Sequence, residues 1–307
     1  MLGLAISLAA AASFAQTAGS VSPELLTPRL GSPLQHYSLK LTAVYDGPLA
    51  PMGLVLKARV NGGPALRLLL DSGAQDIALS RKEAARMGLS GQPGLHLVGM
   101  GASLGTAVRL SPGRMESGGL VLENCPMFST DAPMREGIDG VVPLWLFAGF
   151  MVRLDVPHKT LDLEPFDDSA APGGDTGFRA VRAHQGMLFL EARMNESATG
   201  YMLLDTGAVY NGISPGAARA WPNYRLMGQN ISLASSSGDL DGLLLPPGVE
   251  FRLGSHVLKA DPAVVVDLSA MSKLHAFEVS GVIGYPALRG SVVTIDYRDG
   301  LVRVDGK

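Results

Sequence analysis

The sequence predicts an all-β protein made of two similar lobes. Glycine and proline number 38 and 20, about a fifth of the 307 residues, against a usual share of ~12%. They are scattered between short apolar runs, which indicates many turns joining many short strands. A set of motifs also recurs in the second half of the chain, as expected of an internal repeat. No regular alternation of strands with helices is present, which argues against a parallel α/β sheet.

Composition excludes several classes of function. Lys plus Arg is 25 and Asp plus Glu is 28, so the formal charge is −3. A chain with this balance, and with no basic run, lacks the electrostatic footprint of a nucleic-acid or membrane-surface protein. The hydrophobic share of 47% excludes intrinsic disorder. The single cysteine, Cys125, and six widely spaced histidines give no disulfide and no zinc pattern, so we expect neither metal nor cofactor. Cys125 is expected to be a small core residue.

The N-terminus has the pattern of a sorting signal. Residues 2–15 are apolar or small, and Ser13-Phe14-Ala15 is a small-x-small cleavage site. We therefore expect a signal peptide over 1–15, a leader over 16–36, and an exported protein that is periplasmic or secreted. The apolar run is too short to span a bilayer comfortably, so no membrane span is expected after signal removal. No Lys or Arg precedes this run, which leaves a buried N-terminal helix as the alternative.

Four blocks of the first half are repeated in the second. At an offset of 134 residues, the repeated blocks are Ala58–Asn61 with Ala192–Asn195 and Leu68–Ala74 with Met202–Ala208. At an offset of 141 residues, they are Asp139–Val142 with Ser280–Ile283 and Val152–Asp155 with Val293–Asp296. The repeat predicts homologous lobes over 37–166 and 177–307, joined by a linker over 167–176 that is rich in Asp, Gly and Ala.

Local signals place the elements of the first lobe. Residues 54–60 and 66–70 read as two strands around a turn at Asn61-Gly62-Gly63-Pro64. Ser80-Arg81-Lys82-Glu83 is a capping box, and Gly88 is a suitable residue just beyond a helix end. These signals predict one short helix over about 81–87.

The second lobe carries equivalent signals. Ser214 is a candidate N-cap with Pro215 at the first helical position, which predicts a helix through Trp221. Each lobe is expected to contain one short helix and to end in a strand–turn–strand, with turns at 157–159 and 298–300. Asp155 and Asp296 lie in the repeated strands just before these turns, and we interpret them as turn or hydrogen-bond anchors.

The chemistry is predicted by two Asp-Ser/Thr-Gly motifs, at Asp71 and Asp205. One copy alone is typical of a tight turn after a strand. Here each copy follows a buried-looking apolar strand, precedes Ala, and has the same position within the repeat. Two carboxylates a few ångström apart cannot both ionise cheaply, so they share one proton and supply a base and an acid at the same pH. That pair is suited to peptide hydrolysis, in which a water is activated and a carbonyl oxygen is protonated.

The residues after each aspartate are expected to support this dyad. The hydroxyl groups of Ser72 and Thr206 can form hydrogen bonds across the two loops and hold them rigid. Gly73 and Gly207 allow backbone N–H groups to approach the carboxylates without interference from a Cβ atom.

These residues resemble the retropepsin/pepsin superfamily of aspartic proteases, for which the shared proton is established chemistry. Ala after Gly is closer to retropepsins and to exported bacterial members. The apolar–apolar–Gly marker of the superfamily stands as Val282-Ile283-Gly284. The resemblance covers about 55–166 and 190–307. It implies two β-barrel lobes related by a pseudo-two-fold axis, one catalytic Asp in each, a cleft between them, and a monomer acting on a peptide or protein substrate.

The chain departs from the superfamily's pattern at two places. In the first lobe the marker reads Val141-Val142-Pro143, and proline removes an N–H and fixes φ, so this loop must be built differently. The first lobe also lacks the flap tyrosine of pepsins. The flap candidates are Gly99, Met100 and Gly101 in a Gly-rich hairpin and Ser236 in the facing hairpin; an ordinary exposed hairpin is the alternative for both.

Two other functions are compatible with parts of the sequence. Pro143 and the unassigned flaps leave open a non-catalytic peptide-binding or scaffold protein on the same fold. Gly212–Gly216 also fits a Gly-x-Ser-x-Gly nucleophile elbow, with His256 and His275 downstream. However, the residue after Ser214 is proline, which has no N–H for an oxyanion hole, so a helix cap is favoured. The sequence thus favours an aspartic endopeptidase that uses Asp71 and Asp205.

Overall fold

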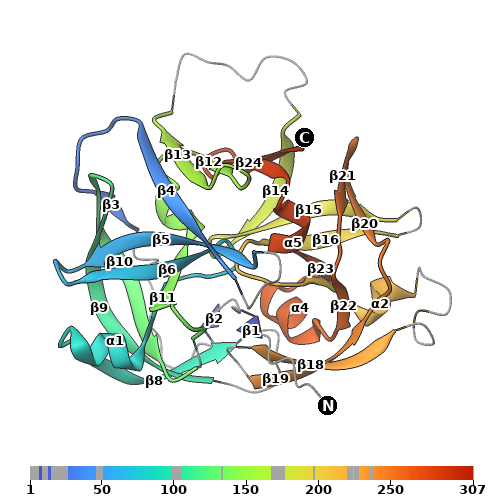
Figure 1. The fold of residues 1–307 in the computed structure, drawn as a ribbon, viewed down its shortest axis with the longest axis horizontal. Coiled ribbons are helices and arrows are strands. Elements are labelled where there is room, and N and C mark those ends of the chain that lie inside the picture. The colour runs from blue at the N-terminus through green and yellow to red at the C-terminus, as the bar shows by residue number, and fades with distance from the viewer. Residues whose placement is uncertain are drawn as a thin grey trace.

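The computed structural model describes residues 7–8, 13–14, 27–45, 51–98, 105–132, 134–166, 177–195, 198–219, 224, 228–235 and 238–306. Over these residues the protein is mostly β and has two lobes, which lie side by side in Figure 1. The predicted all-β, two-lobe fold is therefore confirmed. The predicted boundaries at 15/16, 166/167 and 176/177 fall within or beside gaps in this description, whereas the boundary at 36/37 lies in a described segment; all of them stay predictions.

The first lobe is built from strands before and after one α-helix. Its elements are β3 (Arg29–Leu30), β4 (Tyr37–Val44), β5 (Gly53–Val60), β6 (Ala65–Asp71), β7 (Ile77–Ser80), α1 (Arg81–Arg86), β8 (Gly91–Val98), β9 (Gly105–Ser117), β10 (Leu120–Thr130), β11 (Gly140–Pro143) and the 3₁₀ helix η1 (Leu144–Phe147). Asn61 and Gly62 have φ of 50° and 70°, the left-handed pair that a two-residue hairpin turn requires. The predicted strand pair and its turn are confirmed.

The start of α1 agrees with its sequence signals. The Ser80 hydroxyl accepts a hydrogen bond from the Glu83 N–H at 3.2 Å, and Gly88 has φ of +66° beyond the helix end. The Glu83 carboxylate binds Arg86 instead of turning back to the Ser80 N–H. The Ser80 N–H donates to the Asp139 carbonyl, so this helix has only half of the predicted capping box.

The second lobe follows a similar order but holds more helices than predicted. Its elements are β15 (Met187–Met194), β16 (Ala198–Asp205), β17 (Asn211–Ile213), α2 (Pro215–Ala218), β18 (Gln229–Ser235), β19 (Gly238–Leu244), β20 (Glu250–Leu253), β21 (His256–Lys259), β22 (Ala263–Val266), α4 (Ser269–His275), β23 (Val279–Gly284) and α5 (Tyr285–Leu288).

The prediction of one helix per lobe is wrong for this half. Helix α4 begins after Leu268 without a side-chain cap, so it lacks the N-cap signal that identified α1. Helix α5 spans only four residues, too few for helical periodicity. Helix α2 has the predicted Ser214 cap and Pro215, but it ends at Ala218; Trp221 lies outside the described residues.

A six-stranded sheet joins the lobes in the order β4–β13–β12–β24–β25–β14. The new strands are β12 (Met151–Asp155), β13 (Thr160–Glu164), β14 (Arg179–His184), β24 (Ser291–Asp296) and β25 (Leu301–Gly306). At its centre β12 pairs with β24, and Arg153 lies opposite Thr294. These two residues are 294 − 153 = 141 positions apart, the offset of the repeated blocks. The central pair is therefore arranged with local two-fold symmetry.

One large apolar core runs through both lobes and the shared sheet. It includes the fully buried Phe147 and Phe150 of the first lobe, Leu154 and Val293 of the sheet, and Phe251 of the second lobe. Because this core is continuous, packing of buried side chains holds the lobes together. Cys125 is 0% exposed within it, and burial raises the pKa of its thiol to about 12. Its prediction as a core residue is confirmed.

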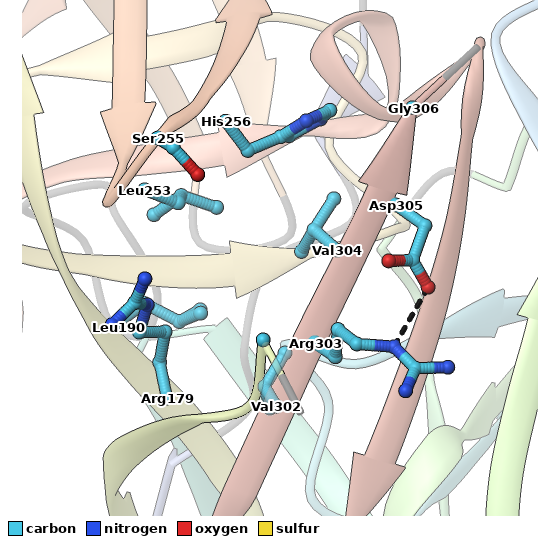
Figure 2. A pocket seen from close by; sticks show the side chains of 11 residues that line it. Arg179, Leu190, Leu253, Ser255, His256, Val302, Arg303, Val304, Asp305 and Gly306 are labelled. Carbon is cyan, nitrogen blue, oxygen red and sulfur yellow. Dashed lines mark hydrogen bonds and ion pairs between the residues drawn. The ribbon is translucent and has the colours of Figure 1, made fainter. Parts of the chain in front are cut away.

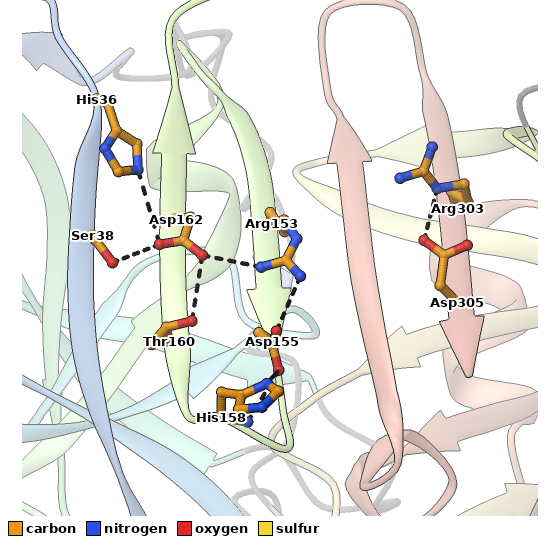
Figure 3. Close-up of polar contacts among 9 residues, drawn as sticks. All are labelled: His36, Ser38, Arg153, Asp155, His158, Thr160, Asp162, Arg303 and Asp305. Carbon is orange, nitrogen blue, oxygen red and sulfur yellow. Dashed lines mark hydrogen bonds and ion pairs between the residues drawn. The ribbon is translucent and has the colours of Figure 1, made fainter. Parts of the chain in front are cut away.

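Polar contacts order the shared sheet and its turns (Figure 3). Asp162 of β13 accepts hydrogen bonds from Ser38 and Arg153. Asp155 ends β12 and accepts a hydrogen bond from the His158 N–H at 3.0 Å. In the matching turn, Asp296 accepts one from the Asp299 N–H, also at 3.0 Å. The interpretation of Asp155 and Asp296 as turn anchors is confirmed.

Replacing Asp155 with alanine is expected to lower the free energy of unfolding at pH 7 by about 1–3 kcal/mol. Burial acts to raise the pKa of Asp155, but hydrogen bonds from His158 and Arg153 outweigh it, so the pKa lies below its usual value. The stabilisation is therefore present above the unfolded-state pKa and is lost as pH falls through the folded one.

Urea unfolding at pH 7 and at acid pH measures this contribution. Asp299→Ala, at an exposed position in the equivalent turn, is the control and should change the free energy by less than about 0.5 kcal/mol. An Asp155→Ala effect that is equally large at both pH values would contradict the assignment.

The N-terminal residues that the structure describes contact both lobes. Strand β1 (Ser7–Leu8) pairs with β18, and β2 (Ser13–Phe14) pairs with β8. Residue Leu30, in the predicted leader, pairs with β10, so the end of that leader is part of the first lobe. In the part of the chain that is described, no helix is long and apolar enough to cross a membrane.

Candidate active site

Both Asp-Ser/Thr-Gly motifs lie at the ends of equivalent strands. Asp71 is the last residue of β6 and pairs in parallel with Pro143 of β11. Asp205 is the last residue of β16 and pairs in parallel with Gly284 of β23. Proline therefore takes the register position of the expected glycine without breaking the strand pairing. Both aspartates are 0% exposed.

Four hydrogen bonds lock the two loops together across the lobes. The Ser72 N–H donates to Thr206 Oγ1 and the Thr206 N–H donates to Ser72 Oγ, each at 3.0 Å. The Ser72 hydroxyl donates to the Leu204 carbonyl at 2.7 Å, and the Thr206 hydroxyl donates to the Leu70 carbonyl at 2.9 Å. The arrangement is reciprocal, so each lobe orients the loop of the other. The two hydroxyl groups therefore form hydrogen bonds across the loops, and their support of a catalytic dyad stays a prediction.

The glycines allow the carboxyl groups to approach the opposite loop. A Cβ atom on Gly73 would lie 2.7 Å from Asp205 Cγ, and one on Gly207 would lie 2.5 Å from Asp71 Cγ. Real Cβ atoms do not approach other atoms so closely, so both positions require glycine. The same glycines donate N–H hydrogen bonds to Oδ1 of the aspartate in their own loop, at 2.7 and 2.9 Å.

The two carboxyl groups form one electrostatic unit. Burial, the charge of Asp205 and a hydrogen bond with Asp205 raise the pKa of Asp71 well above its usual value. Burial also raises the pKa of Asp205 to about 6, although hydrogen bonds from Asp71, Gly207 and Ala208 oppose this. Neither Oδ2 atom has another hydrogen-bond partner among the described residues. The pair can thus retain one proton near neutral pH and offer an acid and a base side by side.

The loop of Asp71 also contacts the second lobe beyond the dyad. The Gln75 side chain donates a hydrogen bond to the Gln185 side chain, and the Gln75 carbonyl accepts one from Trp145 Nε1 at 2.5 Å. Gly186 packs against the Trp145 ring, where a Cβ atom would lie 2.5 Å away. Sequence analysis missed this contact because its members are up to 110 residues apart.

Two further buried polar residues are Asp76 and Asn211. Burial raises the pKa of Asp76 to about 6, with Arg109 opposing the shift. Asn211, which sequence analysis also missed, is fully buried and accepts a hydrogen bond from the Gly284 N–H at 2.9 Å. The available signal was its position 134 residues after Ile77, which puts a polar residue where the first lobe has an apolar one.

The flap candidates Gly99, Met100, Gly101 and Ser236 lie outside the described residues. The strands that lead to them, β8 with β9 and β18 with β19, form antiparallel hairpins. Short strands β1 and β2 pair with one strand of each hairpin, as seen near the centre of Figure 1. The strands on either side of both candidate segments therefore pair, and the role of these segments as flaps stays a prediction.

The Gly-x-Ser-x-Gly motif at Gly212–Gly216 has a structural role. The Ser214 hydroxyl accepts a hydrogen bond from the Ala217 N–H at 3.2 Å and caps α2, as predicted. His275 instead faces His184, with their Nδ1 atoms 2.5 Å apart. Among the described residues, no group of three or more His, Cys, Asp or Glu side chains could hold a metal ion.

A separate pocket of about 290 Å³ opens on the second lobe (Figure 2). It lies between β14, β15, the β20–β21 hairpin and β25. Its polar lining includes Arg179, Ser255, His256 and Arg303, over a floor that includes Leu190. No residue of the two Asp-Ser/Thr-Gly loops lines it, so it is distinct from the dyad.

Comparisons with known proteins give one family match and a similar fold. Residues 56–142, which contain the first motif, match the aspartyl protease family. A search of curated proteins finds no match. The fold is similar to the crystal structure of the aspartic proteinase from Irpex lacteus, with a TM-score of 0.55 and 10% identity over 89% of this chain and 97% of the other. The family match is confined to residues 56–142, and the structural similarity shows that the chain shares the fold of this aspartic proteinase.

Proposed function

We propose that this protein is an aspartic endopeptidase in which Asp71 and Asp205 activate one shared water. The observation that carries the proposal is the reciprocal locking of two buried carboxyl groups by Ser72 and Thr206. Burial raises the pKa of both aspartates, which a purely structural pair of loops would not require. Burying carboxyl groups in this way lowers the stability of the folded protein, and such groups are usually found at reactive sites.

The reaction follows from one proton shared by two carboxyl groups. The ionised carboxylate takes a proton from the water as its oxygen attacks the peptide carbonyl carbon. The protonated carboxyl gives its proton to the carbonyl oxygen, which forms a neutral gem-diol. The protonated carboxyl group then gives its proton to the nitrogen while the ionised carboxylate takes one from a gem-diol hydroxyl. The C–N bond breaks, and an amine and a carboxylic acid leave. The dyad holds one proton at the end of the reaction, as it did at the start. The steps therefore need no group besides the two carboxyl groups and water.

Peptide is the substrate class that the surrounding elements fit. Strands β8 and β18 of the two hairpins already pair with short extended segments of this chain. Edges that accept one extended segment can bind another through main-chain hydrogen bonds. Such recognition is tolerant of sequence, which suits an endopeptidase. We further propose that the protein acts as an exported monomer, since one chain supplies both aspartates.

Digestion of a peptide library by the purified protein tests the proposal. Reactions from about pH 3 to about pH 8, read by mass spectrometry, should show internal cleavage that an excess of chelator or serine-directed reagent does not stop. The cleaved bonds also identify the subsite preferences. Absence of cleavage by correctly folded protein would contradict the proposal and favour a peptide-binding protein of the same fold.

A further inference from the structure

The two lobes support their aspartate loops in different ways. In the second lobe, Asn211 begins β17 and is 0% exposed. Its Oδ1 accepts a hydrogen bond from the Gly284 N–H at 2.9 Å, and its Nδ2 donates to the Pro262 carbonyl at 3.1 Å. Gly284 is the residue that pairs with Asp205. The buried Asn211 amide therefore links β23, which ends at Gly284, to β17, which follows the Asp205 loop.

The first lobe has neither group of this hydrogen bond. The offset of 134 places Ile77, the first residue of β7, at the position of Asn211. The offset of 141 places Pro143 at the position of Gly284, and Pro143 pairs with Asp71 just as Gly284 pairs with Asp205. Proline has no N–H to donate, and the isoleucine side chain has no atom to accept.

The polar pair of the second lobe, Asn211 with Gly284, and the apolar pair of the first, Ile77 with Pro143, cannot exchange single members. A glycine N–H facing isoleucine would be a buried donor without a partner, and an asparagine facing proline would be a buried acceptor without one. Each such orphan costs free energy, so donor and acceptor must be present together or absent together. This explains why the proline in the first lobe is compatible with an intact strand pair.

Two further hydrogen bonds connect the Asn211–Gly284 pair to Asp205. Beside Gly284, the Tyr285 N–H donates to the Ala208 carbonyl at 2.9 Å. The Ala208 N–H in turn donates to Asp205 Oδ1 at 2.9 Å. In the described part of the first lobe, the equivalent backbone hydrogen bond between Leu144 and Ala74 is not formed. Ala208, whose N–H binds Asp205, is thus also held through its carbonyl group.

We propose that Asn211 is a positioning residue for Asp205, and that Ile77 with Pro143 is the apolar replacement of this device in the first lobe. The inference rests on the proposed function and deepens it, because it assigns the placement of one member of the dyad to a residue outside the Asp-Ser/Thr-Gly motifs. Asn211 does not touch the reacting atoms; it acts through Gly284 and Ala208.

Kinetics of Asn211→Leu test this role. The variant keeps the number of side-chain heavy atoms and the branch at Cγ but leaves the Gly284 N–H without an acceptor. We expect kcat to fall about 10- to 100-fold, with KM within about twofold, because the base is displaced while the peptide-binding edges are kept. Substrate is the best-cleaved peptide of the library. Asn211→Asp retains the acceptor, and it should recover most of the wild-type kcat measured at the same acid pH, where its carboxyl is protonated and can still donate to Pro262.

Val265→Ala is the matched control. It removes buried volume from β22, the strand that pairs with β17, but makes none of these hydrogen bonds. It should lower the unfolding temperature and leave kcat unchanged. If Asn211→Leu lowers kcat no more than Val265→Ala does, Asn211 is only structural and the inference fails while the proposed function stands.

A double-mutant cycle in the first lobe tests the exclusive pairing without any activity. Ile77→Asn and Pro143→Gly each create an orphan group and should lower the unfolding temperature by about 3–8 °C. The double variant restores a donor and an acceptor, so it should unfold at a higher temperature than Ile77→Asn alone. Additive losses in the double variant would overturn the inference, whether or not the protein cleaves peptides.

Discussion

Asp205→Asn is expected to lower kcat by about 10⁴-fold, the upper end of what an acid–base group contributes. An amide has the shape of the carboxyl group but cannot take a proton from water at any pH used. Folding should survive the change. Because burial raises the pKa of Asp205 to about 6, keeping this carboxyl group ionised at pH 7 costs the folded protein free energy. The neutral asparagine removes that penalty, so the unfolding temperature at pH 7 should be equal or higher.

Single-turnover cleavage of one library peptide, beside thermal unfolding of the same preparation, measures both effects. Asp296→Asn is the control, because Asp296 is also a buried carboxyl of the second lobe but lies in the shared sheet. Its kcat should remain near that of the wild type. Turnover of wild-type magnitude in Asp205→Asn would remove this residue from the mechanism.

Gly207→Ala is expected to disrupt the dyad from the opposite loop. Its Cβ would lie 2.5 Å from both Cγ and Oδ2 of Asp71, a carboxyl that is fully buried. One of the two loops must move. We expect a loss of about 100-fold in kcat from misplacement of Asp71, and a cost of about 1–3 kcal/mol in the free energy of unfolding.

Gly149→Ala provides the comparison for Gly207→Ala. Gly149 has no atom within 4 Å of a built Cβ and no positive φ, so alanine should change the free energy of unfolding by less than about 0.5 kcal/mol. Denaturant unfolding and steady-state kinetics of both variants check the prediction. Wild-type kcat in Gly207→Ala would show that the carboxyl of Asp71 need not occupy its observed position.

Local signals in the sequence predicted the elements that are determined locally. The turn at Asn61-Gly62 needs two left-handed residues, and the Ser80 cap needs one hydroxyl beside a helix start; each requirement is met by adjacent residues. The locked pair of Ser72 and Thr206 was also predictable, although its members are 134 residues apart. The repeat supplied the missing long-range information, because equal positions in two lobes face each other across a two-fold axis.

Features that differ between the lobes could not be predicted in this way. The N-cap residue of α4, Leu268, has no capping side chain, and Asp267 before it binds the Ser269 N–H instead. The contact between Gln75 and Gln185 has no counterpart motif. Asn211 is an ordinary residue in sequence, and its partner Gly284 lies 73 residues further on. Pro143 was expected to alter its loop, but the compensating Ile77 becomes visible only when the register of both lobes is known.

The pH dependence of kcat/KM for the wild-type protein tests the central claim, that two buried carboxyl groups share one proton. Burial raises the pKa of Asp205 to about 6 and that of Asp71 further above its usual value. The carboxylate that acts as base therefore forms as pH rises through about 6, and activity should be lost as pH falls below it. The pKa of Asp76 is also raised to about 6, so the profile is measured on Asp76→Asn as well. An acid limb near pH 6 in both proteins is the predicted result. Full activity down to about pH 3, or loss of the limb in Asp76→Asn, would contradict the shared-proton dyad.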